Sequence, residues 1–141
     1  MGWIDRLSRT PLLARLGMTL LASAFVVFLS TIPGHTRYED SNFVWLVAAT
    51  PVGLQKSLHV LVYAALSILW IWALEKLDPR WLRLATALLL ATAFGAALEW
   101  AQTMVPGRYG TLSDVILNAF GAILGLALAV WFSRTRNASS T

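Results

Sequence analysis

The fold is decided by the stretch LSDVILNAFGAILGLALAVWF, residues 112–132, whose single charged residue is Asp114. A helix of about 20 mostly apolar residues is long enough to cross the hydrocarbon core of a bilayer. Three more stretches have the same character: residues 12–32, 54–74 and 84–105. The sequence therefore predicts an all-α integral membrane four-helix bundle, formed by a single transmembrane domain over residues 1–141.

The composition excludes most other classes of protein. Apolar residues make up 57% of the chain and charged residues 13%, whereas soluble domains average about 25% charged residues. The formal net charge is +4, but the basic residues stand at the edges of the apolar stretches, so we expect no nucleic-acid partner. The chain has no cysteine, which excludes thiolate metal sites and thiol nucleophiles.

The distribution of Lys and Arg predicts the orientation, because cytoplasmic connections carry an excess of these residues. Eight lie on the side that holds both termini, and three lie on the other side. The eight are Arg6, Arg9, Arg15, Lys76, Arg80, Arg83, Arg134 and Arg136, and the three are Arg37, Lys56 and Arg108. We therefore expect a multi-pass protein with both termini in the cytoplasm (N-in/C-in).

The connection over residues 33–53 is the longest, and part of it is apolar. Residues 43–49 include Trp45 and contain no charged side chain. This part is either a short helix at the outer surface or an ordinary loop, and the sequence leaves both possibilities open.

Polar side chains on three of the spans fall at one depth. With about 1.5 Å of rise per residue, most of them lie within roughly 10 Å of the outer boundary. Ionisable groups inside a membrane are costly and usually face the bundle interior. We therefore predict one polar pocket that opens to the outer side and is built on the second, third and fourth spans. Its expected members are Lys56, His59, Glu99, Gln102, Arg108, Asp114 and Asn118.

The residue types suggest roles for this cluster. Lys56 and Arg108 are candidates for binding an anion. His59 and Glu99 are candidate catalytic groups, as an acid/base pair, if the protein is an enzyme, which the sequence leaves open. The two amides, Gln102 and Asn118, would orient a ligand by hydrogen bonds, and Asp114 would pair with a cation.

A purely structural interpretation stands beside this one. Two cations, Lys56 and Arg108, balance two carboxylates, Glu99 and Asp114, so the cluster could be a closed ion network that fixes helix packing. Thr111 and Asp114 also have the spacing of a helix capping box. Gly121 and Gly125 have the spacing of a helix-packing motif. A single histidine beside two cations argues against a metal site, and we expect neither a metal nor a cofactor.

These residues, taken in order, resemble the VanZ-like membrane proteins. The resemblance rests on Lys56-x-x-His59-x-x-x-Tyr63, Glu99-x-x-Gln102, Pro106-Gly107-Arg108, Asp114, Asn118, Gly121 and Gly125. The family commonly has an aspartate before the lysine, where this chain has Gln55. The resemblance implies a small multi-span protein of the bacterial cytoplasmic membrane. Its founding member is associated with resistance to teicoplanin, a glycopeptide that targets cell-wall precursors.

Three functions remain as hypotheses. The first is binding or modification of a polar head group, from a membrane lipid or a cell-wall precursor, at the outer leaflet. The second is a small proton-coupled transporter, because buried Glu and His side chains can relay protons. The third is a non-catalytic assembly partner in an envelope complex, in which the polar cluster only stabilises the fold.

Overall fold

The structure is a computed structural model that describes residues 10–34 and 41–138. Within these ranges the chain is helical and contains no strand. The helices are α2 (Leu12–Thr31), α3 (Asn42–Ala48), α4 (Val52–Ala73), α5 (Arg80–Gln102) and α6 (Leu112–Ala138). All but α3 are long and apolar enough to cross a membrane, so the predicted all-α fold with four membrane spans is confirmed.

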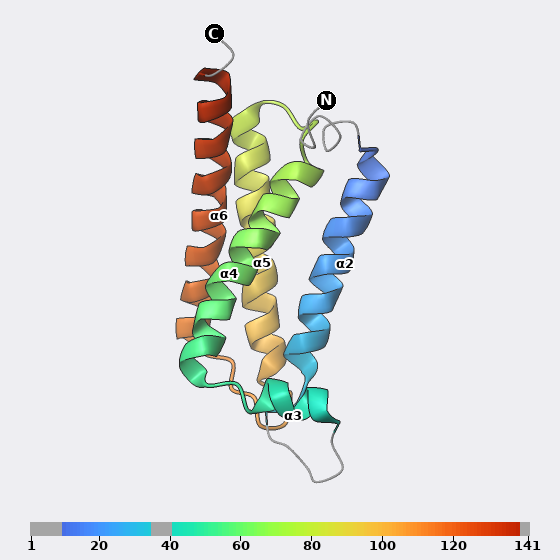
Figure 1. Cartoon of the computed structure of the whole chain (residues 1–141), viewed down its shortest axis with the longest axis vertical. Helices are drawn as coiled ribbons and strands as arrows, with labels where there is room; N and C mark the ends of the chain where they lie inside the picture. Colours follow the sequence, from blue (N-terminus) through green and yellow to red (C-terminus); the bar gives the residue numbers. More distant parts are fainter. Residues whose placement is uncertain (1–9, 35–40, 139–141) are drawn as a thin grey trace.

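The four long helices run side by side, and the short α3 lies across one end of the bundle (Figure 1). We call this end the α3 end. The start of α2 and the close of α6 both lie at the opposite end (Figure 1), as an even number of spans requires. Arg6, Arg9 and Arg37, which contribute to the charge count, lie outside the described residues. The N-in/C-in orientation stays a prediction.

Three of the long helices begin directly after a proline. Pro11, Pro51 and Pro79 precede α2, α4 and α5, with φ angles of −58°, −57° and −75°. Proline fixes φ near −65° and lacks the N–H that a helix start leaves without an intrahelical partner, so it suits this position. These prolines set the helix starts and therefore the height at which each side chain stands in the bundle.

The connection between the first two spans contains a short helix, α3, so it is not an ordinary loop, and its place at the outer surface stays a prediction. Its side chains Phe43, Trp45 and Leu46 are all largely exposed. Large apolar side chains exposed at the end of a membrane bundle are typical of a helix that lies in the lipid interface, where Trp is enriched. In the first turn of α4, Gln55 donates a hydrogen bond from Nε2 to the Thr50 carbonyl (2.8 Å), and this bond ties the connection to α4.

Small residues bring α4 and α6 into close contact. A β-carbon at Gly121 would overlap the carbonyl of Val60, and one at Gly125 would overlap the carbonyl of Ala64. Membrane helices gain packing energy from such approaches, since lipid supplies no hydrophobic drive for helices to associate. The Gly121-x-x-x-Gly125 stretch therefore acts as the predicted packing motif, and it leaves no open space between these two helices.

The α2 helix is held to α4 by polar side chains at the end opposite α3. Arg15 is 1% exposed; it donates to the Trp72 carbonyl at 3.1 Å and forms an ion pair with Glu75. One turn further along, Thr19 Oγ1 donates to the Leu69 carbonyl at 3.3 Å. These bonds fix α2 against the second half of α4, and the space between the two helices opens toward the α3 end.

Candidate functional site

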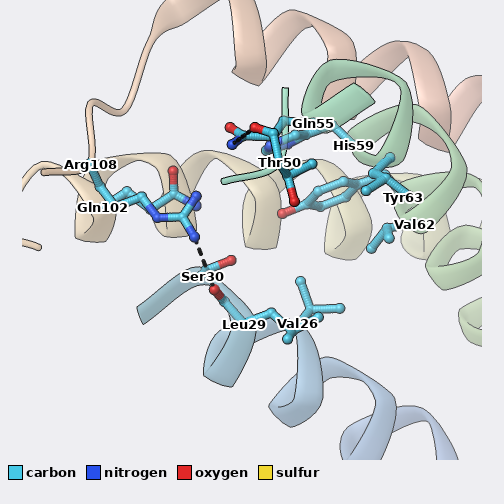
Figure 2. Close-up of a pocket in the computed structure, with 11 residues that line it drawn as sticks. Val26, Leu29, Ser30, Thr50, Gln55, His59, Val62, Tyr63, Gln102 and Arg108 are labelled. Carbon is cyan, nitrogen blue, oxygen red and sulfur yellow. Dashed lines mark hydrogen bonds between the residues drawn. The ribbon is translucent and has the colours of Figure 1, made fainter. Parts of the chain in front are cut away.

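A cavity of about 240 Å³ lies between α2 and the first half of α4. Figure 2 shows Arg108 and Gln102 on one wall, side chains of α4 on a second, and side chains of α2 on a third. The polar lining contains the guanidinium, amide, imidazole and phenol groups, and the apolar lining comes mainly from α2 and α4. The lining residues are Val26, Leu29, Ser30, Thr50, Gln55, Leu58, His59, Val62, Tyr63, Gln102 and Arg108.

A chain of hydrogen bonds stands behind the α4 wall of the cavity. His59 Nδ1 lies 2.8 Å from Asn118 Oδ1, and Asn118 Nδ2 donates to Glu99 Oε1 at 3.4 Å. A carbonyl oxygen only accepts, so His59 Nδ1 is the donor and the amide nitrogen points at the carboxylate. The chain joins α4, α6 and α5 in that order, and Asn118 at its centre is 0% exposed.

Glu99 is the buried acid at the far end of this chain. Its side chain is 4% exposed, and Oε1 lies 3.6 Å from His59 Nδ1. The other oxygen, Oε2, accepts the backbone N–H of Thr111 at 3.4 Å. A carboxylate this deep requires hydrogen-bond donors around it, and the polar face of α6 and the chain just before it supply them.

Tyr63 is part of the same wall, four residues after His59. Its ring is nearly parallel to the imidazole, at 11°, with the ring centroids 6.5 Å apart. The residue is 3% exposed, and Figure 2 shows its ring reaching toward the cavity. Gly95 makes room for this arrangement, because a β-carbon there would lie 2.9 Å from the Tyr63 ring and 3.0 Å from Asn118.

Arg108 stands in the connection between α5 and α6, next to the end of α2. Gly107, with φ of 73°, turns the chain so that this side chain points back over the bundle. Its Nε donates to the Ile32 carbonyl at 2.9 Å and one terminal nitrogen donates to the Leu29 carbonyl at 3.4 Å. These carbonyls belong to the last turn of α2 and to the residue that caps its C-terminus, where helix carbonyls lack intrahelical partners.

The charge of Arg108 is affected by its partial burial. Burial lowers the pKa of its guanidinium from the ordinary value, and the negative charge of Glu99 acts in the opposite direction. Arginine remains protonated in proteins despite such shifts. Within the described ranges no salt bridge joins Arg108 to a carboxylate. The cavity therefore has a partly buried positive charge on its wall.

The structure brings together most of the predicted site residues, in two layers. His59, Gln102 and Arg108 line the cavity. Glu99 and Asn118 lie directly behind His59 and reach the cavity only through it. A pocket with polar groups in its lining lies at the α3 end, but its walls differ from the expectation: α2 supplies one wall, and α6 supplies none of the lining. That the pocket opens to the outer side stays a prediction.

The close approach of α4 and α6 explains this difference. Gly121 and Gly125 place α6 so near α4 that Asn118 is used in bonds between helices and no space remains there. On α2, by contrast, the bonds of Arg15 and Thr19 to α4 lie at the opposite end of the bundle, and the cavity is lined by Val26, Leu29 and Ser30 of the other half of the helix. The space is therefore left beside α2, whose sequence has no polar pattern at that end that would have indicated a cavity.

Lys56 and Asp114 do not join the cavity. The Lys56 side chain is exposed, and Gln55 lines the cavity in its place. One residue turns a helix by about 100°, and a lysine can extend to the interface instead. Asp114 accepts a hydrogen bond from Thr111 Oγ1 at 2.7 Å, and its backbone N–H donates to that same oxygen at 3.2 Å.

Asp114 therefore has the capping role that the sequence left open, at the N-terminus of α6, where a negative charge is favourable. Among the described residues it forms no ion pair. The closed network of two cations and two carboxylates is also not formed in this part of the chain, because Lys56 faces away from the cluster and Arg108 binds carbonyls of α2.

Sequence reasoning missed several contributors. Thr50 and Gln55 line the cavity, and the buried Arg15 forms a second polar centre at the opposite end of the bundle. The charge pattern identifies Arg15 only as a basic residue at the edge of a span, whereas its spacing of four from Thr19 indicates a polar helix face. In the described ranges, no group of three His, Asp or Glu side chains gathers to hold a metal.

Comparison with known proteins agrees with this description. No solved structure matches the chain. The family model described as VanZ/LLP1 matches residues 11–133, which include every residue of the cavity wall and of the hydrogen-bonded chain behind it. Most of the 141 residues fall in this range. The chain, a membrane protein with four spanning helices, therefore belongs to the VanZ/LLP1 family.

Proposed function

We propose that this protein binds the anionic part of a lipid or cell-envelope head group in the cavity at the α3 end. One observation carries the proposal: the partly buried guanidinium of Arg108, which forms no salt bridge among the described residues, faces a cavity whose lining is apolar over most of its surface. Arg108 has five N–H donors, and two of them are used by the carbonyls of α2. Within the part of the chain that the structure describes, no hydrogen bond uses the others, so they can bind a phosphate or carboxylate, as guanidinium groups do well.

The size and lining of the cavity favour an amphiphile. A volume of about 240 Å³ is below the 300–1,000 Å³ that is typical of pockets for a whole drug-sized ligand. It suits a head group whose chains stay in the bilayer. Val26 and Leu29 of α2 and Leu58 and Val62 of α4 offer apolar contacts for the adjoining part of such a molecule.

The orientation is part of the proposal. With both termini in the cytoplasm, the α3 end faces outward, and the cavity lies at the outer leaflet of a bacterial cytoplasmic membrane. Precursors of the cell wall are exposed at that surface. The proposal therefore gives the glycopeptide resistance suggested by the family resemblance a physical setting, through binding of envelope amphiphiles.

A role as an assembly partner is the second candidate, and a different observation favours it. The chain from His59 through Asn118 to Glu99 joins three helices and is mostly buried, as expected of groups that stabilise a fold. Transport is less well supported, because Thr19 and Arg15 bond directly to carbonyls of α4 on the way to the opposite end. If the protein is an assembly partner, Glu99→Gln, which removes the charge of this side chain, should lower the abundance of the protein in the membrane.

The proposal is tested by the lipid-induced rise in melting temperature of the purified protein in detergent. The variants are Arg108→Lys, which keeps the charge but loses the forked donors, and Gln102→Leu, which leaves the bonds to α2 intact. Lys56→Gln is the matched control, since it removes a cation near the same end outside the cavity. Short-chain phosphatidylglycerol is the ligand, and diacylglycerol with the same chains is the comparison without phosphate.

We expect phosphatidylglycerol to stabilise the wild type and Lys56→Gln equally, and the other two variants less. A hydrogen bond to a charged group contributes about 1.5–3 kcal/mol, so Arg108→Lys should weaken binding by about 10- to 100-fold. An equal response in all four proteins, or a wild-type response to diacylglycerol as large as that to phosphatidylglycerol, would contradict the proposal.

A further inference from the structure

The bond between His59 and Asn118 determines which face the imidazole presents to the cavity. Nδ1 carries the hydrogen, because it lies 2.8 Å from an amide oxygen that only accepts. The amide itself is held in this direction by Glu99, which accepts from Asn118 Nδ2. Reversing the amide would place its oxygen against a carboxylate, so the arrangement of the three side chains is self-consistent.

The second ring nitrogen, Nε2, is therefore an acceptor in the neutral imidazole. His59 lines the cavity and its side chain is 25% exposed. Within the described part of the chain, no hydrogen bond uses Nε2, and this atom is not among the buried polar atoms without a partner. The imidazole thus offers a lone pair at Nε2, on the α4 wall of the cavity.

We propose that His59 selects head groups that carry a hydrogen-bond donor. The ligand class is a glycerophospholipid whose phosphate binds Arg108 and whose ammonium or hydroxyl group donates to His59 Nε2. This inference rests on the proposed function and adds a second point of recognition to it. Asn118 and Glu99 act as positioning residues, since they set the ring's tautomer without touching the ligand.

Two phospholipids separate donor recognition from charge. Phosphatidylethanolamine and phosphatidylcholine with the same acyl chains have the same net charge, but only the first has N–H donors. One net hydrogen bond corresponds to roughly a three- to tenfold difference in affinity. We therefore expect the wild-type protein in detergent to bind phosphatidylethanolamine about three- to tenfold more tightly than phosphatidylcholine, measured by native mass spectrometry.

His59→Asn is the informative variant. The asparagine amide can still donate to Asn118 from the position of Nδ1, but it has no atom in place of Nε2. The preference for phosphatidylethanolamine should fall to about one, while binding of phosphatidylcholine changes by less than about twofold. A preference retained in His59→Asn, or absent from the wild type, overturns the inference.

A second measurement does not depend on a variant of the site. The chain has two histidines, so ¹⁵N-histidine spectra of the wild type can be assigned with a His35→Gln control. We expect the His59 signals of the Nδ1–H tautomer, with Nε2 shifted by phosphatidylethanolamine and not by phosphatidylcholine. An Nε2–H tautomer would overturn the inference.

The two proposals fail in different ways. If Arg108→Lys binds phospholipid as tightly as the wild type, the proposed function fails. If binding depends on Arg108 but the two phospholipids bind equally, only the selection by His59 fails.

Discussion

Replacing Asn118 by alanine removes the central member of the hydrogen-bonded chain behind the cavity. The side chain is fully buried, and it makes one bond of 2.8 Å with His59 and one of 3.4 Å with Glu99. The shorter bond contributes about 1 kcal/mol net, and loss of the donor to Glu99 leaves a buried carboxylate oxygen short of a partner, which costs about 1–3 kcal/mol. We expect Asn118→Ala to lower the free energy of unfolding by about 2–4 kcal/mol.

A double-mutant cycle with His59→Ala isolates the bond between the two residues. Either single change removes it, so the double variant loses it only once, and the coupling energy should be about 1 kcal/mol. The measurement is reversible unfolding in mixed micelles with increasing denaturing detergent, for the wild type, both single variants and the double variant.

Thr19→Ala combined with Asn118→Ala is the control cycle. Thr19 bonds to carbonyls of Arg15 and Leu69 and to no member of the chain behind the cavity, so the two effects should add within about 0.3–0.5 kcal/mol. If the coupling of His59 with Asn118 is no larger than this control value, the two side chains do not depend on one another and the reasoning is refuted.

Two further predictions concern packing and orientation. Gly125→Val should lower the free energy of unfolding by about 1–3 kcal/mol more than Gly17→Val. A side chain at position 125 would overlap the carbonyl of Ala64, whereas one at position 17 would meet open space. Thermal melting in detergent measures the difference, and equal losses would contradict the close contact of α4 and α6. Since the chain has no cysteine, single replacements Ser41→Cys and Lys76→Cys report orientation: we expect a membrane-impermeant maleimide to label the first in intact cells and the second only after permeabilisation, and the opposite pattern would reverse the predicted topology.

The spans were readable from the sequence because hydropathy and length suffice to identify a membrane helix. Their ends were less readable. The third span was expected over residues 84–105, whereas α5 is Arg80–Gln102. Its polar first turn, with Arg80 and Arg83, is helical because Pro79 starts the helix there, and an apolar pattern alone excludes such a turn. An apolar pattern also misses the end of α6, because this helix continues past residue 132 into a polar stretch that ends at Ala138.

The candidate site was predictable where burial decides the outcome. His59, Glu99 and Asn118 meet because buried polar groups in a membrane need partners. The position of Lys56 was not predictable from its spacing, because a long side chain near a helix end can extend to water. The wall formed by α2 could not be read either, since Leu29 and Val26 look like any lipid-facing residues.

Arg108 both faces the cavity and binds α2, so it links ligand binding to the packing of α2 against the bundle. The same guanidinium that faces the cavity holds the final carbonyls of α2. By thermodynamic reciprocity, an anion that favours this placement of the guanidinium also favours the docked α2, to the same extent that docking favours the anion. Occupancy of the cavity would then be visible as slower amide exchange along the whole of α2, including its half beyond the cavity, so this helix becomes a natural place to attach a reporter.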